Sequence, residues 1–146
     1  MGKQQDPARR LENQLCFAVY STAHAFNRVY KPLLDPFGLT YPQYLVMLVL
    51  WDEEEVTVKR LGELLHLDSG TLTPLLKRLE ANGWLTRRRS AEDERKVLVA
   101  LTDAGRELEA KTAAVPRDLL CATGLQVDEL LELRGRLAGL RDRMVG

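Results

Sequence analysis

Apolar residues recur every three or four positions along the first part of the chain, which predicts a long helix over about residues 8–34. Pro36 and Gly38 are expected to end this helix. Residues 40–43 read Thr-Tyr-Pro-Gln, a capping box with proline in the first turn, and predict the start of a second helix. We expect that second helix to end near the acidic run at residues 52–55.

Two short helices and a hairpin are predicted next. Thr57 can cap the first helix, and Asp68 can cap the second, which stops at the Asn-Gly pair of residues 82–83. Residues 84–89 and 96–101 read as two strands joined by a charged turn. The leucines expected to face inward are Leu61, Leu64, Leu65, Leu72, Leu75, Leu76 and Leu79. This order is that of a winged helix-turn-helix, whose second helix enters the major groove of DNA.

The last third of the chain is predicted to be helical. Thr102 can cap a fifth helix, Pro116 should kink or divide it, and a final helix follows Gly124. Its apolar residues form a short heptad seam: Leu130, Leu133, Leu137, Leu140 and Met144. Such a seam can pack on its own domain. The long first and last helices, however, lie outside the compact central module and need another surface, which a dimer supplies.

The expected architecture is therefore mainly α with a small β-hairpin wing. It comprises one domain over residues 1–146, with the helix-turn-helix and wing at about 57–101 and dimerisation helices at about 8–35 and 102–146. A chain of 146 residues can bury a stable hydrophobic core without disulfides or structural metal ions.

Composition argues against a membrane or secreted protein. The first ten residues have no apolar run after their charges, and no apolar stretch approaches the roughly 20 residues of a membrane span. A cytoplasmic location and no membrane partner are expected. The net charge is zero, but residues 57–96 hold nine Lys and Arg against six Asp and Glu. This surplus of positive charge indicates DNA binding only if it lies on a structural element that fits DNA.

The outer face of the second short helix is small, hydroxylated and basic, which suits an approach to base edges and phosphates. In the hairpin, Asp93 precedes Arg95 by two residues and can hold its guanidinium for a narrow minor groove. A charge run is more often only a solvated face, but its place after a helix pair favours DNA binding. Pro74 can be a tolerated residue near the helix start or an apolar contact to a thymine methyl group. The candidate DNA-binding residues are Ser69, Thr71, Thr73, Pro74, Lys77, Arg78, Arg87, Asp93, Arg95 and Lys96.

Cys16 and Cys121 form no CxxC pair, so a structural disulfide is not expected in a cytosolic chain. Composition alone favours two buried, inert thiols. His24 and His66 are isolated, so no metal site is expected. Signatures of common catalytic and nucleotide sites are absent from the sequence, and no cofactor is expected.

The segments DSGTLTPLLKRLEANGWLTR and DERKVLVALTDAG resemble the MarR family of repressors, and the resemblance covers nearly the whole chain. LENQLCFAVYS, YKPLLD and LTYPQYLVMLVLW are similar to its organic-hydroperoxide-sensing, OhrR-type members. The resemblance implies that Cys16 is a peroxide-reactive thiol and that Tyr30 and Tyr41 of the partner subunit hydrogen-bond its sulfur. Tyr20 would lie near this site. Cys121 would resolve the oxidised thiol across the dimer, unless a cellular thiol does so.

The implied function is that of a homodimeric repressor that binds a pseudo-palindromic operator and releases it when organic hydroperoxides oxidise the cysteine. Phenol hydroxyls that donate to sulfur favour thiolate chemistry. An apolar pocket is expected near the thiol, and Phe17, Phe26, Leu45 and Met47 can contribute to it.

Two other functions stay open. The first is a MarR-type repressor that responds to a non-redox ligand such as a phenolic compound. The second is a thiol peroxidase, which would need an arginine near Cys16. Arg28 is the nearest candidate, and at twelve residues along the same helix it is too far away.

Overall fold

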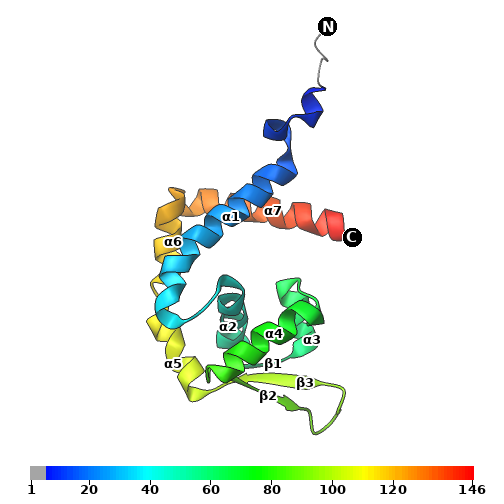
Figure 1. Ribbon diagram of the computed structural model, residues 1–146, viewed down its shortest axis with the longest axis vertical. Coiled ribbons are helices and arrows are strands. Elements are labelled where there is room, and N and C mark those ends of the chain that lie inside the picture. The colour runs from blue at the N-terminus through cyan, green and yellow to red at the C-terminus, as the bar shows by residue number, and fades with distance from the viewer. Residues whose placement is uncertain (1–5) are drawn as a thin grey trace. The chain divides into compact units, whose positions relative to one another are not determined.

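The computed structural model describes residues 6–146, which divide into two compact units, one ending at Thr112 and the other spanning Ala113–Gly146 (Figure 1). The first unit contains α1 (Leu15–Leu34), α2 (Tyr41–Glu53), β1 (Glu55–Thr57), α3 (Val58–Leu65), α4 (Ser69–Ala81), β2 (Leu85–Arg89), β3 (Val97–Leu101) and α5 (Asp103–Lys111). The second contains α6 (Val115–Thr123) and α7 (Val127–Val145). A mainly helical chain with a small β wing is confirmed.

Helix α1 begins at Leu15, later than the apolar pattern predicted. Two short 3-10 turns, Pro7–Arg9 and Leu11–Asn13, precede it. The side-chain amide of Asn13 donates to the carbonyl of Pro7 at 2.8 Å. Side chains that bond to nearby backbone in this way compete with helix formation, which explains the late start.

The junction between α1 and α2 follows the sequence prediction. After Leu34 a short 3-10 turn leads to Gly38 at φ 66°, a left-handed conformation that glycine adopts without strain. The Thr40 hydroxyl accepts the Gln43 N–H at 3.4 Å, and the Gln43 carbonyl oxygen accepts the Thr40 N–H at 3.0 Å. The capping box is therefore confirmed, and it fixes the direction in which α2 leaves the junction.

The core of the first unit surrounds α2. Its fully buried side chains include Val46, Met47, Leu50, Leu61, Leu72, Leu76, Leu79 and Val99. The prediction that Leu64 faces inward was wrong, because 39% of it is exposed. The eight-residue α3 packs mainly through Leu61, and Leu64 falls at the edge of that contact.

Local signals place the helix-turn-helix correctly. Thr57 accepts the Arg60 N–H at 3.1 Å and opens α3. Asp68 accepts the Thr71 N–H at 2.7 Å and opens α4. Gly83, at φ 82°, follows the end of α4 as the stop signal predicted.

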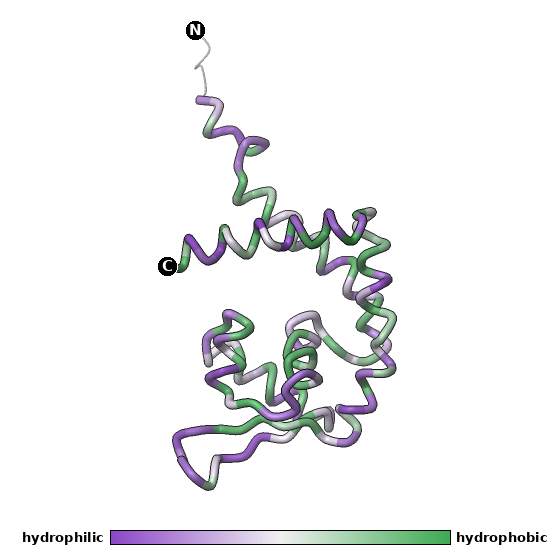
Figure 2. Tube along the Cα trace, turned by 180° about the vertical axis from the view of Figure 1, so that it is seen from behind, coloured by the Kyte–Doolittle hydropathy of each residue, from purple (hydrophilic) through white to green (hydrophobic). Residues whose placement is uncertain are grey.

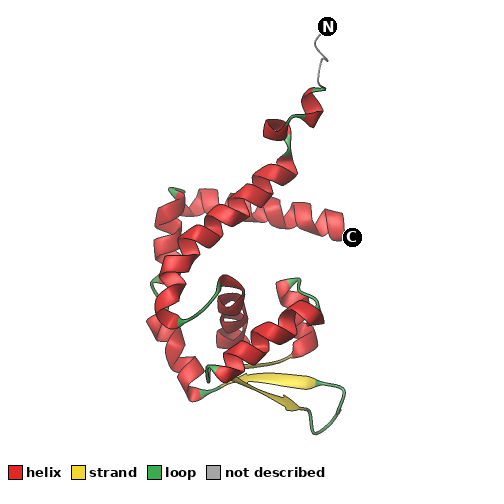
Figure 3. Ribbon diagram, in the orientation of Figure 1, coloured by secondary structure: helices red, strands yellow, loops and turns green. Residues whose placement is uncertain are grey.

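The sheet has three antiparallel strands in the order β1-β3-β2 (Figure 3). The predicted hairpin is confirmed, with Leu85 opposite Leu101 and Arg89 opposite Val97. Strand β1 was not predicted. It is only three residues long and begins with the last residue of the acidic run, so its pairing with β3 leaves little trace in the sequence.

The helices after the wing divide as Pro116 indicated. Helix α5 ends at Lys111, and Pro116 lies in the first turn of α6. Gly124, at φ 68°, separates α6 from α7. Within Val127–Val145 no residue is buried. Apolar residues recur along this helix (Figure 2), and those most exposed are Val127, Leu131, Leu133, Leu137, Met144 and Val145.

Across residues 6–146 no single helix is long and apolar enough to cross a membrane. By length and composition alone, the segment Leu15–Phe37 passes that test together with α2, as a pair bent by 67°.

Candidate DNA interface and thiol site

The surface of α4 exposes the polar residues that the sequence assigned to DNA. Ser69, Thr71, Pro74, Lys77 and Arg78 are exposed, on the side away from the buried leucines. Bonds donated by the backbone and hydroxyl of Thr71 lower the pKa of Asp68, so this cap is charged at neutral pH.

Thr73 differs from its neighbours because its hydroxyl is already used within the helix. It donates to the carbonyl of Ser69 at 2.7 Å, and the residue is half-buried. Pro74 lies inside α4, exposed to solvent. Both accounts of Pro74, a tolerated residue and a base contact, therefore fit its position.

In the turn between β2 and β3, the side chain of Arg95 is almost completely exposed to solvent. The side chain of Arg95 is 93% exposed, while its Nε lies 3.4 Å from Asp93 Oδ1, which also accepts its backbone N–H at 3.0 Å. The expectation that Asp93 holds Arg95 is confirmed as a contact. Lys96 is exposed beside it.

The three arginines of β2 have partners within the chain. Arg87 donates its backbone N–H and its guanidinium to Glu80 of α4, at 2.9 and 3.0 Å. Arg88 pairs with Glu55 of β1 at 3.0 Å, and Arg89 donates to the carbonyl of Glu94 at 2.9 Å.

Sequence reasoning overlooked Glu80 and Glu55. The only available signal for Glu80 was an acidic residue near the end of α4, the recognition helix expected to enter the major groove, seven positions before an arginine. That spacing has no meaning until the strand is placed against α4. The paired guanidinium holds the pKa of Glu80 below its usual value, so the pair is charged at neutral pH.

Both cysteines are exposed, so the expectation from composition that the two thiols are buried was wrong. Because α1 starts late, Cys16 lies in its first turn, where its thiol donates to the side-chain oxygen of Gln14 at 3.8 Å. Tyr20 lies one turn further along and packs against His24, with ring centroids 4.4 Å apart.

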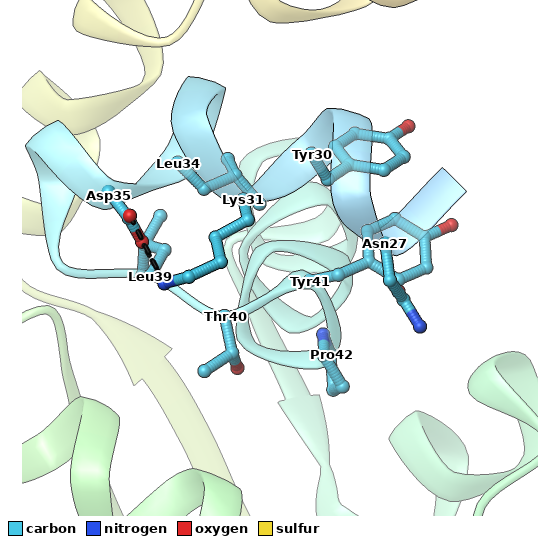
Figure 4. Close-up of a pocket in the computed structure, with 9 residues that line it drawn as sticks. All are labelled: Asn27, Tyr30, Lys31, Leu34, Asp35, Leu39, Thr40, Tyr41 and Pro42. Atoms are coloured by element: carbon cyan, nitrogen blue, oxygen red, sulfur yellow. Dashed lines mark hydrogen bonds and ion pairs between the residues drawn. The ribbon is translucent and has the colours of Figure 1, made fainter. Parts of the chain in front are cut away.

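Tyr30 and Tyr41 form a stacked pair with ring centroids 4.4 Å apart and planes at 30°. Burial, and then the neighbouring Tyr41 phenol, raise the pKa of Tyr30; burial also raises the pKa of Tyr41. Both phenols are therefore protonated at neutral pH and can donate hydrogen bonds. Figure 4 shows their hydroxyl groups on the same side of the stack.

The stacked tyrosines line a hollow of about 310 Å³ at the junction of α1 and α2 (Figure 4). The other lining residues are Asn27, Lys31, Leu34, Asp35, Leu39, Thr40 and Pro42. The four residues proposed from sequence for an apolar pocket do not line this hollow in the described part of the chain, and Met47 belongs to the core. The helix pattern could not distinguish core from pocket positions.

The hollow cannot serve Cys16 of the same chain. Tyr30 follows Cys16 by 14 residues on one helix, and at about 1.5 Å per residue the two lie roughly 21 Å apart. Cys16 and Tyr30, which the resemblance brings together only across a dimer, thus lie far apart within one chain.

Comparisons with known proteins give a consistent result. The family described as transcriptional regulator SarA/Rot matches residues 28–111. The HTH-type transcriptional regulator TtmR of Methylorubrum extorquens is 53% identical over 140 residues, covering 96% of this chain and 72% of that protein. The organic hydroperoxide resistance transcriptional regulator of Bacillus subtilis is 47% identical over 135 residues, covering 92% of each chain.

A solved relative, AbfR of Staphylococcus epidermidis, is similar in fold. Its reduced form bound to DNA gives a TM-score of 0.79 at 37% identity, covering 94% of this chain and 96% of that chain. Its disulfide form gives a TM-score of 0.64 at 39% identity, covering 90% of this chain and 92% of that chain. Its overoxidised form bound to DNA gives a TM-score of 0.78 at 37% identity, covering 92% of this chain and 95% of that chain.

Proposed function

Since this chain belongs to the MarR family of winged-helix transcriptional regulators, we propose that it is an operator-binding repressor that an organic hydroperoxide releases from DNA by oxidising Cys16. One observation carries the redox part of the proposal. An exposed thiol lies at one end of α1, and a hollow with two protonated phenols lies roughly 21 Å away at the other.

This separation has a simple solution in a two-fold dimer, in which each thiol meets the hollow of the partner subunit. A dimer would also cover apolar side chains that are exposed in the single chain. On and just before α1 these are Leu11, Leu15, Phe17, Val19 and Tyr20. On α7 they include Leu131, Leu133 and Leu137. Exposed apolar stripes of this extent are typical of protein interfaces.

The DNA-binding part of the proposal rests on α4 and the wing. A dimer presents two copies of α4, so its operator would be a pseudo-palindrome with half-sites about one helical turn apart or a multiple of it. Exposed cations, among them Lys77, Arg78 and Arg95, are available to phosphates and grooves. A regulator of chromosomal operators works in the cytoplasm, and that location is part of the proposal.

The proposed chemistry is a two-electron oxidation of sulfur. The Cys16 thiolate attacks the terminal oxygen of the hydroperoxide, an S–O bond forms and the O–O bond breaks. The alkoxide that leaves takes a proton from water and departs as the alcohol. The cysteine is left as a sulfenic acid. Attack by a second thiol then gives a disulfide and water.

Phenol hydroxyls from Tyr30 and Tyr41 of the partner would donate to the sulfur and to the oxygen that develops negative charge. Because burial raises the pKa of both phenols, they stay protonated and retain this donor role throughout the physiological pH range. Leu34, Leu39 and Pro42 give the hollow an apolar part that suits the organic group of the peroxide.

The similarity to AbfR supports a response to oxidation, because that relative has been solved reduced on DNA, overoxidised on DNA and in a disulfide form. Because the named relatives are transcriptional regulators, we propose one oxidation event per release and no catalytic turnover.

The test uses a labelled duplex selected by the reduced protein from a random-sequence pool. Binding is measured alone, with cumene hydroperoxide, and then with dithiothreitol. Release by the peroxide and rebinding after reduction support the proposal. Release by salicylate and not by peroxide supports the phenolic-ligand alternative. Sustained peroxide consumption with dithiothreitol indicates a thiol peroxidase.

A further inference from the structure

A row of aromatic side chains leads from the hollow towards the wing. Tyr30, which lines the hollow, lies 6.0 Å from the ring of Tyr44, and Tyr44 meets Trp51 edge-on at 6.1 Å. Tyr44 is buried and Trp51 is half-buried on α2. The Trp51 indole N–H then donates to the carbonyl of Gly105, in the first turn of α5, at 2.9 Å.

The Gly105 end of this row touches the connection between α4 and the wing. A Cβ added at Gly105 would lie 2.0 Å from the carbonyl oxygen of Trp84, so only glycine fits this approach. Trp84 precedes β2 directly, and its carbonyl accepts the Thr102 N–H at 3.2 Å. Thr102 caps α5, and its hydroxyl donates to the carbonyl of Gly83, just after α4.

The start of α5 is thus held against the backbone that joins the recognition helix to the first wing strand. These contacts all lie within the first unit. Trp51 joins α2 to this point through a single directional bond.

We propose that Trp51 is a positioning residue that transmits the state of the tyrosine hollow to α4 and the wing. The inference rests on the proposed function, in which oxidation of Cys16 takes place beside Tyr30 and Tyr41. Close-packed interiors do not absorb displacements continuously. A shift of the tyrosines must therefore move Tyr44 and Trp51, or open gaps between their rings.

The indole N–H makes the coupling specific. When Trp51 moves, either α5 follows it or the bond to Gly105 breaks and leaves a poorly solvated donor, which is unfavourable. Movement of α5 in turn displaces the Gly83–Trp84 connection. In this way a change at the hollow alters the angle between α4 and β2, and hence the fit to DNA.

The chain contains two tryptophans, so a substitution of one can serve as the control for a substitution of the other. Trp51 donates to Gly105, whereas the buried indole nitrogen of Trp84 has no hydrogen-bond partner in the structure of residues 6–146. The Trp84 contact to α5 comes from its backbone, which substitution leaves in place. Trp84→Phe therefore removes an indole without removing the proposed link.

The experiment compares wild type, Trp51→Phe and Trp84→Phe, each as the full chain with cumene hydroperoxide as the probe. Two quantities are measured: the rate at which Cys16 is oxidised, by mass spectrometry, and the factor by which peroxide weakens binding to the selected duplex. In the wild type this factor should be in the range of about 5–150. In Trp51→Phe it should fall roughly fivefold, equivalent to about 1 kcal/mol at 1.4 kcal/mol per tenfold change. Trp84→Phe should keep the wild-type factor.

The oxidation rate of Cys16 should be the same in all three proteins, because Trp51 acts after the chemistry. Equal release of Trp51→Phe and wild type would overturn the inference and leave the proposed function intact. Absence of release in the wild type would overturn the proposed function itself.

A second readout does not depend on the stability of Trp51→Phe. In Trp84→Phe, Trp51 is the sole tryptophan, so its fluorescence reports on its own surroundings. Peroxide should change its emission in step with release from DNA. Release with unchanged Trp51 emission would contradict the proposed link.

Discussion

Glu80 on the recognition helix holds both the backbone N–H and the guanidinium of Arg87 on the first wing strand, at 2.9 and 3.0 Å. This pair joins α4 to β2, and the side chain of Arg87 is only 24% exposed. A carboxylate that accepts two bonds from one residue fixes orientation as well as distance. We therefore expect Arg87 to act on DNA binding through the angle of the wing.

Glu80→Gln tests this role, because the amide keeps the shape and removes the charge. Operator affinity should fall, and the effect of Arg95→Ala should be smaller in the Glu80→Gln background, since a loosened wing no longer delivers Arg95 to the groove. A double-mutant cycle on operator binding measures this coupling. Additive effects of the two substitutions would show that Glu80 only stabilises the fold.

The same pair contributes to the acid stability of the protein. Arg87 lowers the folded-state pKa of Glu80, so its stabilisation is present above the unfolded value of about 4.3 and is lost as pH falls through the lowered folded value. Thermal unfolding at neutral pH and near pH 3 should therefore differ less in Glu80→Gln than in the wild type.

Arg95→Ala should weaken operator binding and reduce the salt dependence of the affinity. A groove or phosphate contact releases about one counterion, so the slope of log affinity against log salt should fall by roughly 1. Arg136→Ala is the matched control, because Arg136 is an exposed arginine paired with Glu132 on α7. An unchanged slope in Arg95→Ala would mean that this side chain does not touch DNA.

The local parts of the fold could be predicted from the sequence because their signals lie within a few residues. The Thr40 capping box, the Asp68 cap and the stop at Gly83 each depend on neighbouring positions only. The same holds for the hairpin and for the division of the last helices near Pro116.

Features that depend on distant contacts could not be predicted. Strand β1 exists because β3 pairs with it, and the Glu80–Arg87 contact exists because β2 packs against α4. The start of α1 was misjudged because Asn13 binds the backbone of a preceding turn. The roles proposed for Cys16 and the tyrosines came from family resemblance alone, since periodicity does not reveal whether a thiol is exposed.

Tyr30→Phe and Tyr41→Phe should slow the oxidation of Cys16 and leave operator binding by the reduced protein unchanged. Each removes a hydroxyl that we propose donates to the sulfur of the partner subunit, and each keeps the stacked ring. Loss of one hydrogen bond to a charged group, about 1.5–3 kcal/mol, corresponds to a rate reduced by roughly 10- to 150-fold. Stopped-flow measurement of thiol loss with cumene hydroperoxide gives the rate.

Tyr44→Phe is the control for these variants, because Tyr44 packs on Tyr30 and does not line the hollow. Its oxidation rate should equal that of the wild type. If all three phenylalanine variants react at the wild-type rate, the phenols do not assist the thiol.

Cys121 is expected to form a disulfide with the oxidised Cys16 of the other subunit. It is exposed on α6, and a bond requires the two Cα atoms to approach within about 7 Å. Non-reducing gels of peroxide-treated protein should show a dimer band that is missing in Cys121→Ser. A monomer band carrying the mass of a mixed disulfide would indicate that a small thiol resolves Cys16.

The central claim is tested most directly by operator binding of Cys16→Ser with and without cumene hydroperoxide. Serine is nearly isosteric with cysteine and cannot form a sulfenic acid, so the variant should bind the operator like the reduced wild type. Added peroxide should release the wild type and leave Cys16→Ser bound. Release of Cys16→Ser at the same peroxide concentration as the wild type would contradict the account.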